Sequence, residues 1–310
     1  MESDGFLSRQ EVVCPPDLLR RAAGQGPAVT AIVGADHSVV LDSAHQAQAA
    51  GIITPVLIGS RSEIETEARE IGWDISGVEI VEASGESGAA QAGAELASSG
   101  GVAMVMKGHV HSDTFMRPLL AKEGGIRGSG RLSHVFHMTV PDRERSIMLT
   151  DCALNVAPNI RTRIAIIENA VALAHQLGNA EPRVALLAAS ESVSEAMPVT
   201  QECEQIANHF LTSELSAEVF GPLAFDNIVS TEAAKMKGID HPVAGGADVV
   251  VVPTIEAGNP LFKMMVYFMS ACAGGIVLGG SVPALLTSRA DPPAARLASA
   301  ALGAISARPG

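Results

Sequence analysis

Short runs of apolar residues alternate with alanine-rich amphipathic segments along almost the whole chain. The apolar runs predict strands at residues 28–34, 55–59, 102–106, 146–151, 184–189, 247–253, 275–279 and 283–287. The amphipathic segments predict helices at residues 42–50, 61–71, 87–99, 112–123, 160–177, 200–211, 226–236, 256–273 and 292–305. Because the apolar runs are continuous, we expect helices on both faces of the sheet. The alternation therefore predicts an α/β fold built on a largely parallel sheet.

The length of 310 residues is enough for two domains. The glycine-rich, basic segment "KEGGIRGSGR" at residues 122–131 interrupts the alternation, and we interpret it as the crossover between them. The long apolar stretch at residues 261–280 contains Lys263 and is interrupted by two glycines. We therefore expect a buried helix followed by a buried strand there, and no membrane span.

The net charge and the cysteine content indicate which classes of partner and which cellular compartment suit this chain. With 34 acidic against 21 basic side chains the formal charge is −13, which opposes binding to nucleic acid. A small anionic ligand is still compatible, because nearby basic residues dominate at close range. The four cysteines lie far apart without a C-x-x-C pair, and the chain does not start with a signal peptide. These features favour the reducing cytoplasm.

Several common motifs are absent from the sequence. It has no dinucleotide fingerprint G-x-G-x-x-G, no Walker loop and no G-x-S-x-G. The histidine pairs His109/His111 and His134/His137 lack further ligands at zinc spacing, so we expect hydrogen-bonding or capping roles and no metal site.

Polar residues follow four of the predicted strands, where open α/β sheets bind ligands. "MKGHVHSDTFMRPLL" places Lys107 at a strand exit and Arg117 in the next helix. "LTDCALNVAPN" places Asp151 and Asn155 after a second strand. Each segment also has a purely structural interpretation, a capped helix with a surface arginine in the first and an Asx turn in the second.

The other two corners are "PTIEAGNPLFK", with Asn259 and Lys263, and "LTSRAD", with Ser288 and Arg289. The structural alternatives are a core helix with one lysine reaching solvent, and a helix cap beside a surface arginine. Three of the four corners contain a cation. Together they predict a site for a phosphate-bearing substrate, with lysine as a point charge and arginine as a bidentate clamp.

These corners resemble those of the phosphate acetyltransferase and phosphate butyryltransferase family. The segments that carry the resemblance are "MKGHVHSDTFMRPLL", "RLSHVFHM", "LTDCALNVAPN", "GPLAFDNIVSTEAAKMKGI", "PVAGGADVVVVPTIEAGNPLFK" and "GGIVLGGSVPALLTSRAD". The acyltransferase part of longer hydratase–acyltransferase fusions is the most similar. The resemblance implies transfer of an acyl group, acetyl or butyryl, between coenzyme A and inorganic phosphate through a ternary complex. It leaves the preferred chain length open.

The resemblance also implies an architecture. We expect a two-domain α/β/α sandwich similar to isocitrate and isopropylmalate dehydrogenases, with the active site in the cleft between the domains. Residues 1–128 and 276–310 would form one domain and residues 129–275 the other. Coenzyme A would be a substrate and no cofactor would be bound permanently. The family implies a homodimer or higher homo-oligomer.

Carried over onto this sequence, the family's catalytic pair falls on Ser288 and Arg289, and its phosphate-binding arginine on Arg117. Substrate-binding roles are also expected for Lys107, Ser133, Asp151, Asn155, Asn259 and Lys263. In acetyltransferases of the family a carboxylate seven residues after the serine is a proposed base. Ala295 occupies that position here. Asp291 lies nearby but could simply cap the helix, so the sequence assigns no base.

Two other functions compete with this hypothesis. The first is a metal- and nicotinamide-dependent 2-hydroxy acid dehydrogenase of similar fold, which would need clustered aspartates where Asp151, Asp226 and Asp291 are scattered. The second is a regulator that binds acyl phosphate or coenzyme A without turnover, a hypothesis suggested by Ala295.

Overall fold

The computed structural model describes residues 7–128, 130–141, 143, 145–287 and 291–307. The chain divides into two compact units. The terminal unit consists of Val12–Leu132 and Gly274–Gly310, and the central unit of Met1–Glu11 and Ser133–Ala273. Among the described residues, no helix combines the length and the apolar character needed to cross a bilayer.

The terminal unit is built around a sheet with the strand order β3-β2-β1-β4-β11-β10. Its strands are β1 (Ala28–Val33), β2 (Ile53–Gly59), β3 (Glu79–Glu82), β4 (Met104–Lys107), β11 (Ala284–Leu285) and β10 (Cys272–Leu278), whose first two residues belong to the central unit. All neighbours pair in parallel except β10 and β11, which are antiparallel. Val33 pairs with Lys107, so the carboxyl ends of β1 and β4 lie side by side.

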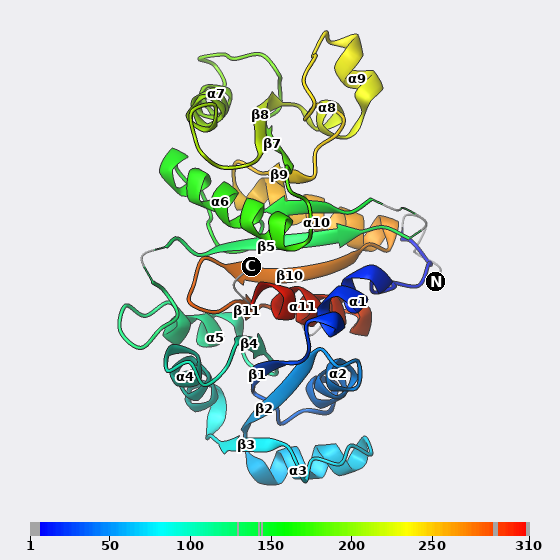
Figure 1. The fold of residues 1–310 in the computed structure, drawn as a ribbon, viewed down its shortest axis with the longest axis vertical. Coiled ribbons are helices and arrows are strands. Elements are labelled where there is room, and N and C mark those ends of the chain that lie inside the picture. Colours follow the sequence, from blue (N-terminus) through cyan, green and yellow to red (C-terminus); the bar gives the residue numbers. More distant parts are fainter. Residues whose placement is uncertain (1–6, 129, 142, 144, 288–290, 308–310) are drawn as a thin grey trace. The chain divides into compact units, whose positions relative to one another are not determined.

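Helices cover both faces of this sheet, as the continuous apolar runs predict (Figure 1). They are α1 (Pro16–Gly24), α2 (Ser38–Ala49), α3 (Arg61–Glu70), α4 (Gly85–Ser98), α5 (Ser112–Leu119) and α11 (Pro293–Ser306). Helices α1, α11, α2 and α3 pack in succession on one face, and α4 packs with α5 on the other. Alanines and glycines on α2, α4 and α11 permit this close packing, because they add little bulk between helix and sheet.

The central unit has the strand order β5-β6-β9-β7-β8. Its strands are β5 (Ser133–Thr139), β6 (Ile147–Thr150), β7 (Arg183–Leu187), β8 (Glu218–Leu223) and β9 (Val249–Val251). Its helices are α6 (Ile160–Gln176), α7 (Pro198–Phe210), α8 (Phe225–Val229), α9 (Thr231–Met236) and α10 (Ile255–Met269). Only β5 and β6 pair antiparallel among its ladders, so β5 begins where β6 ends. Helices α6 and α7 pack together, and α10 contacts β6 from the opposite side (Figure 1).

The prediction of a buried helix is wrong for α10. All fifteen of its residues are described, yet only Gly258 is buried. Met264, Tyr267, Phe268 and Met269 are between 45% and 54% exposed. Hydrophobicity alone does not show whether an apolar helix packs inside a protein or carries an apolar surface, and α10 does the second.

The four cysteines are thiols, and all four are buried.

Candidate active site

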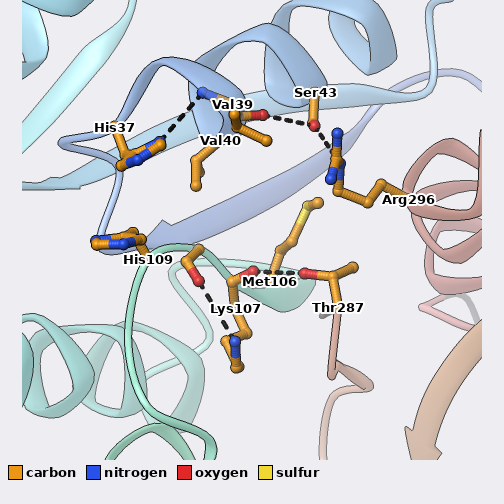
Figure 2. A pocket seen from close by; sticks show the side chains of 10 residues that line it. His37, Val39, Val40, Ser43, Met106, Lys107, His109, Thr287 and Arg296 are labelled. Carbon is orange, nitrogen blue, oxygen red and sulfur yellow. Dashed lines mark hydrogen bonds between the residues drawn. The ribbon is translucent and has the colours of Figure 1, made fainter. Parts of the chain in front are cut away.

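A pocket of about 180 Å³ lies in the terminal unit at the carboxyl ends of β1 and β4 (Figure 2). Its apolar wall consists of Val39, Val40 and Met106. The polar and imidazole side chains that line the rest are His37, Ser43, Lys107, His109, Thr287 and Arg296. This position matches the rule that open α/β sheets bind ligands beyond the carboxyl ends of their strands.

Lys107 was predicted from the sequence and does line the pocket. It is the last residue of β4 and only 5% exposed, and its Nζ lies 3.5 Å from the Gly108 carbonyl oxygen. The Thr287 hydroxyl donates a 2.7 Å hydrogen bond to the Lys107 carbonyl oxygen. This bond fixes the chain beside Lys107 immediately before the predicted catalytic pair. Ser288 and Arg289 themselves lie outside the described residues.

Arg296 on α11 lines the pocket and was not predicted from the sequence. Its Nε donates to the Ser43 hydroxyl at 2.7 Å, and Nη1 donates to the Asp291 carbonyl oxygen at 2.6 Å. Burial lowers the pKa of Arg296, while the carboxylates of Asp291 and Asp42 act in the opposite direction. One signal was available: Arg296 is the only charged residue in the segment "PPAARLASAALGAIS".

Two histidines form the rim of the pocket. The rings of His37 and His109 stack with centroids 4.4 Å apart at an angle of 25°. His37 also caps α2, because its Nδ1 accepts a 3.3 Å hydrogen bond from the Val39 amide. His109 and His111 form a pair by their spacing in the sequence, but in the structure His109 stacks on His37, whereas the ring of His111 contacts Glu86.

In the central unit, Asp151 organises the corner that follows β6. The carboxylate is 2% exposed and accepts hydrogen bonds from the amides of His134, Ala153 and Leu154 at 2.9–3.1 Å. A fourth bond comes from the Asn155 side-chain amide at 2.6 Å. Since a carboxylate has about four acceptor positions, Asp151 is fully engaged in holding this loop. The bond from the Ala153 amide to Asp151 Oδ1 forms the Asx turn that was the structural alternative for this segment.

Ser133 and His134 open β5 beside this corner, because the antiparallel pairing places Val135 opposite Thr150. The Asn169 side-chain amide donates to the Ser133 hydroxyl at 2.9 Å. His134 is 1% exposed, and its two ring nitrogens have no hydrogen-bond partner in the part of the chain that is described. Burial lowers its pKa to about 4, against an opposing effect of the Asp151 charge.

The N-terminal half of α10 lies against the same corner. A Cβ on Gly258 would come within 2.7 Å of the Cys152 sulfur, so only glycine allows this approach. Burial is also the main cause of the raised pKa of Cys152, and the Asp151 charge adds to it. Of the predicted residues on α10, Asn259 is half-buried and Lys263 exposed.

Arg117 lies in the last turn of α5 in the terminal unit, with an exposed side chain. The structure thus groups Asp151, Asn155 and Ser133 in the central unit and places Lys107 in the pocket of the terminal unit. Among the described residues, no three His, Cys, Asp or Glu side chains are grouped as a metal site would require.

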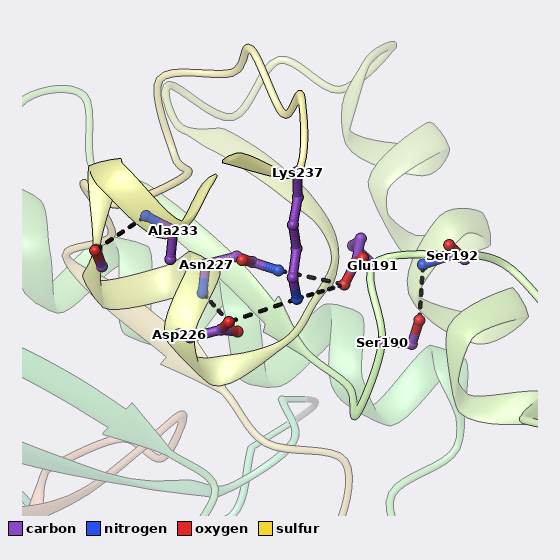
Figure 3. Close-up of polar contacts among 8 residues, drawn as sticks. Ser190, Glu191, Ser192, Asp226, Asn227, Ala233 and Lys237 are labelled. Carbon is purple, nitrogen blue, oxygen red and sulfur yellow. Dashed lines mark hydrogen bonds and ion pairs between the residues drawn. The ribbon is translucent and has the colours of Figure 1, made fainter. Parts of the chain in front are cut away.

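A further polar cluster in the central unit follows β7 and β8 (Figure 3). Lys237 Nζ contacts Glu191 at 3.1 Å and Asp226 at 3.5 Å, and the amide of Asn227 donates to Glu191 at 3.3 Å. The hydrogen bond to Glu191 is the largest cause of the raised pKa of Lys237. Because these charges are largely solvated, each pair contributes little to stability. The cluster fastens the loop after β7 to α8 and the end of α9.

A largely parallel α/β sheet with a pocket at the carboxyl ends of its strands is the arrangement in which α/β proteins commonly bind small ligands. Comparison with known families makes the class specific. The family model described as phosphate acetyl/butaryl transferase matches residues 86–304. The chain belongs to this family, and its members are acyltransferases.

Individual relatives agree with this assignment. The chain is 39% identical to a phosphate acetyltransferase of Rhizobium meliloti, over 93% of this chain and 92% of that protein. It is 37% identical to a phosphate butyryltransferase of Clostridium acetobutylicum, over 89% of this chain and 92% of that protein. Its fold is similar to the crystal structure of a branched-chain phosphotransacylase from Enterococcus faecalis V583. That comparison has a TM-score of 0.81 and 31% identity over 90% of this chain and 99% of the other. These relatives favour the acyltransferase hypothesis over the hydroxy acid dehydrogenase.

Proposed function

We propose that the protein transfers a short acyl group reversibly between coenzyme A and inorganic phosphate. The observation that carries this proposal is the pocket in which a buried Lys107 lies beside Thr287, Arg296 and an apolar wall, at the carboxyl edge of the sheet. A cation beside an apolar surface suits a substrate that is both anionic and acylated. The named activities of the relatives support the same reaction.

The reaction needs positioning more than covalent help from the protein. The coenzyme A sulfur attacks the acyl carbonyl carbon, a C–S bond forms, and the C–O bond to the phosphate breaks with its electron pair leaving on phosphate. The thiol proton passes to phosphate or solvent. An ordinary thiol with a pKa near 8.5 is already a few per cent ionised at neutral pH, so only modest activation is required. Orientation and stabilisation of the developing charge then supply most of the rate.

The roles of the residues follow from this chemistry. We propose that Arg117 and Arg289 hold the phosphoryl group, with Lys107 as a further positive charge. Ser288 would donate a hydrogen bond to the thiol or to the carbonyl oxygen as charge develops. The substrate-binding residues proposed in the central unit are Ser133, Asp151, Asn155, Asn259 and Lys263. The four hydrogen bonds at Asp151 support a positioning role, in which it holds Asn155 in place.

Variants of Ser288 and Arg289 test the proposal directly. Coenzyme A release or acylation is followed with a thiol reagent, using acetyl and butyryl phosphate as substrates. We expect Arg289→Ala to lower kcat/KM at least a hundredfold at an unchanged melting temperature, and Arg289→Lys to restore it only in part, because lysine lacks the bidentate geometry. Ser288→Ala should lower kcat by about 100-fold or more, comparable to the loss of an oxyanion-hole donor.

The alternatives predict other results. Oxidation of 2-hydroxy acids only with nicotinamide and a divalent metal would identify the dehydrogenase. Saturable binding of coenzyme A without turnover would identify the regulator. Near-normal activity of Arg289→Ala would show that Arg289 is a surface residue without a catalytic role. If Ser288→Ala melts several degrees lower but keeps its turnover, Ser288 is a helix cap.

We further propose two domains at residues 1–128 with 276–310 and at residues 129–275, in a fold similar to isocitrate and isopropylmalate dehydrogenases. The two compact units support the boundaries near residues 128 and 276, because they divide after Leu132 and after Ala273, whereas residues 1–11 are grouped with the central unit. The four buried thiols are compatible with a cytoplasmic location.

We also propose a homodimer, supported by an apolar groove of about 410 Å³ in the central unit. The residues that line it are Ile147, Leu149, Phe225, Val229, Leu261, Met264, Met265, Phe268 and Met269. Five of the lining side chains come from α10, and Tyr267 on the same helix is 54% exposed outside the lining. A second copy would therefore present a matching apolar helix to the same surface, as a twofold contact requires.

A further inference from the structure

Arg296 is a buried cation that uses only part of its hydrogen-bonding capacity within the chain. It is 9% exposed and lines the pocket of the terminal unit. A guanidinium group has five N–H donors. Nε donates to the Ser43 hydroxyl and Nη1 to the Asp291 carbonyl oxygen. Two of the five donors are thus used, and the other three have no hydrogen-bond partner among the described residues.

The charge of Arg296 also lacks a direct counter-ion in the described part of the chain, where no ion pair includes it. Burial lowers its pKa, and the more distant carboxylates of Asp291 and Asp42 oppose this effect only in part. Asp42 accepts a 2.7 Å hydrogen bond from the Gln46 side chain instead. Because a buried charge without a partner is costly, Arg296 is suited to an anion that comes from solution.

Ser43 fixes the orientation of the guanidinium group. Its hydroxyl donates to the Val39 carbonyl oxygen within α2 at 2.8 Å. A hydroxyl has a single hydrogen, so toward Arg296 it can only accept, and Nε donates to it at 2.7 Å. This bond joins α11 to α2 and holds the planar group at Nε (Figure 2). The remaining N–H groups are therefore preorganised for a ligand in the pocket.

The rest of the pocket lining suits an anion as well. Lys107 is a second cation in the lining, and His37 and His109 form the rim. His37 Nδ1 accepts from the Val39 amide, so the neutral ring carries its hydrogen on Nε2. Among the described residues no carboxylate lines the pocket, although the chain has 34 acidic against 21 basic side chains. At short range these cations outweigh the negative net charge.

We propose that Arg296 binds a phosphate group of a substrate in this pocket. The proposal rests on the acyl transfer proposed above, since inorganic phosphate, acyl phosphate and coenzyme A all carry such a group. The planar fork of a guanidinium matches two phosphate oxygens. A cavity of about 150 Å³ accepts benzene, so a pocket of about 180 Å³ has room for a phosphate group.

The test compares wild type, Arg296→Met and Arg296→Lys in buffer without phosphate or sulfate. Arg296→Met should raise the KM of the substrate whose phosphate occupies the pocket about 10–100-fold, as expected for the loss of charge-assisted hydrogen bonds. Arg296→Lys should restore binding only in part, because lysine lacks the fork, and it keeps the test decisive if Arg296→Met does not fold. Arg21→Met, at an exposed position on α1 outside the pocket, is the matched control and should keep all KM values.

The KM values identify the source of the phosphate. A raised KM for inorganic phosphate assigns the pocket to the transferred group. A raised KM for butyryl-CoA that disappears with the dephospho form assigns it to the 3′-phosphate of coenzyme A, and one that persists assigns it to the pyrophosphate. Each of these results supports the proposal.

Binding is also measured without turnover, as the rise in melting temperature with added inorganic phosphate. We expect this rise in wild type and Arg21→Met, whereas Arg296→Met should need at least tenfold more phosphate for the same rise. Unchanged KM values and an unchanged rise, even with a lower melting temperature or a lower kcat, would show that Arg296 only joins α11 to α2 and would overturn the proposal. A wild type without turnover, whose phosphate-dependent rise still requires Arg296, would overturn the proposed function alone.

Discussion

Among single residues, His134 stands out because its imidazole is buried and makes no hydrogen bond to any described residue. A buried imidazole without hydrogen-bond partners among the described residues costs free energy, and its neutral form is the less expensive one to bury. The lowered pKa, about 4, follows from that burial.

We predict a pH-dependent loss of stability caused by this residue. The unfolded chain binds a proton at His134 near pH 6.5, but the folded chain does so only near pH 4. Stability from this residue is therefore complete above about pH 6.5 and is lost as the pH falls from 6.5 to 4, with a slope of up to about 1.4 kcal/mol per pH unit. Urea unfolding of wild type and His134→Gln across this range should show that slope in the wild type alone.

The exposed His209→Gln variant is the matched control, and should keep the wild-type slope. Parallel stability curves for wild type and His134→Gln would contradict the buried, neutral imidazole.

The sequence predicted some of the pocket and corner residues because their position follows from strand ends. Lys107 comes directly after an apolar run, and Asp151 follows another, so a parallel sheet brings each to its carboxyl edge. Arg296 and His37 could not be found this way. Arg296 reaches the pocket from a helix that is distant in sequence, and the stacking of His37 on His109 depends on how two loops pack.

Among the elements, α4 offers a test of how helix and sheet pack. Gly93 and Gly88 both lie inside this helix, but a Cβ on Gly93 would come within 2.5 Å of Val33 Cγ2, whereas nothing lies within 4 Å of one on Gly88. Val33 is buried and β-branched, so it has little room to move. We expect Gly93→Ala to lower the free energy of unfolding by about 1–3 kcal/mol.

Gly88→Ala should instead raise that free energy by about 0.5–1 kcal/mol, because alanine is the better helix former. Both values come from urea unfolding monitored by circular dichroism. Equal effects of the two substitutions would show that α4 does not pack on β1 at Gly93.

The elements that were predicted are those with long uniform patterns. Each of the eight expected strands is present, although the last shrinks to the two residues of β11. Strands β3, β5 and β8 were not predicted, because their sequence patterns are weaker. β3 is a short strand with charged ends, β5 contains two histidines, and β8 contains Gly221 and Pro222. The helix expected at residues 226–236 is divided into α8 and α9, where Ser230 caps α9 by accepting from the Ala233 amide.

At the scale of the whole molecule, the exposed apolar groove predicts association. Met264 lines the groove and is 53% exposed, whereas Met236 on α9 is 77% exposed and lies outside it. We expect Met264→Glu to convert a dimer into a monomer in light scattering after size exclusion, because the buried charge would lack a partner in the contact. Met236→Glu carries the same change of charge and should remain dimeric.

A monomeric wild type at micromolar concentration, or dissociation of both variants, would exclude this groove as the contact. The exposure of α10 was not predictable from its own sequence, since an apolar helix of this length suits a core and an interface equally well. The two-unit organisation depends on contacts between the chain ends, such as those of α1 with α11, which local patterns do not show.

The burial of all four sulfur atoms has a practical meaning for enzymology. Cys152 and Cys203 are held as protonated thiols, since burial raises both pKa values, that of Cys203 to about 11. Alkylating and disulfide reagents attack thiolates at accessible positions. We therefore expect the folded protein to react very little with these reagents, so that in an assay they measure the thiol of free coenzyme A. Because the native thiols react so little, a single cysteine introduced at the surface could be labelled with a fluorophore without competition from them.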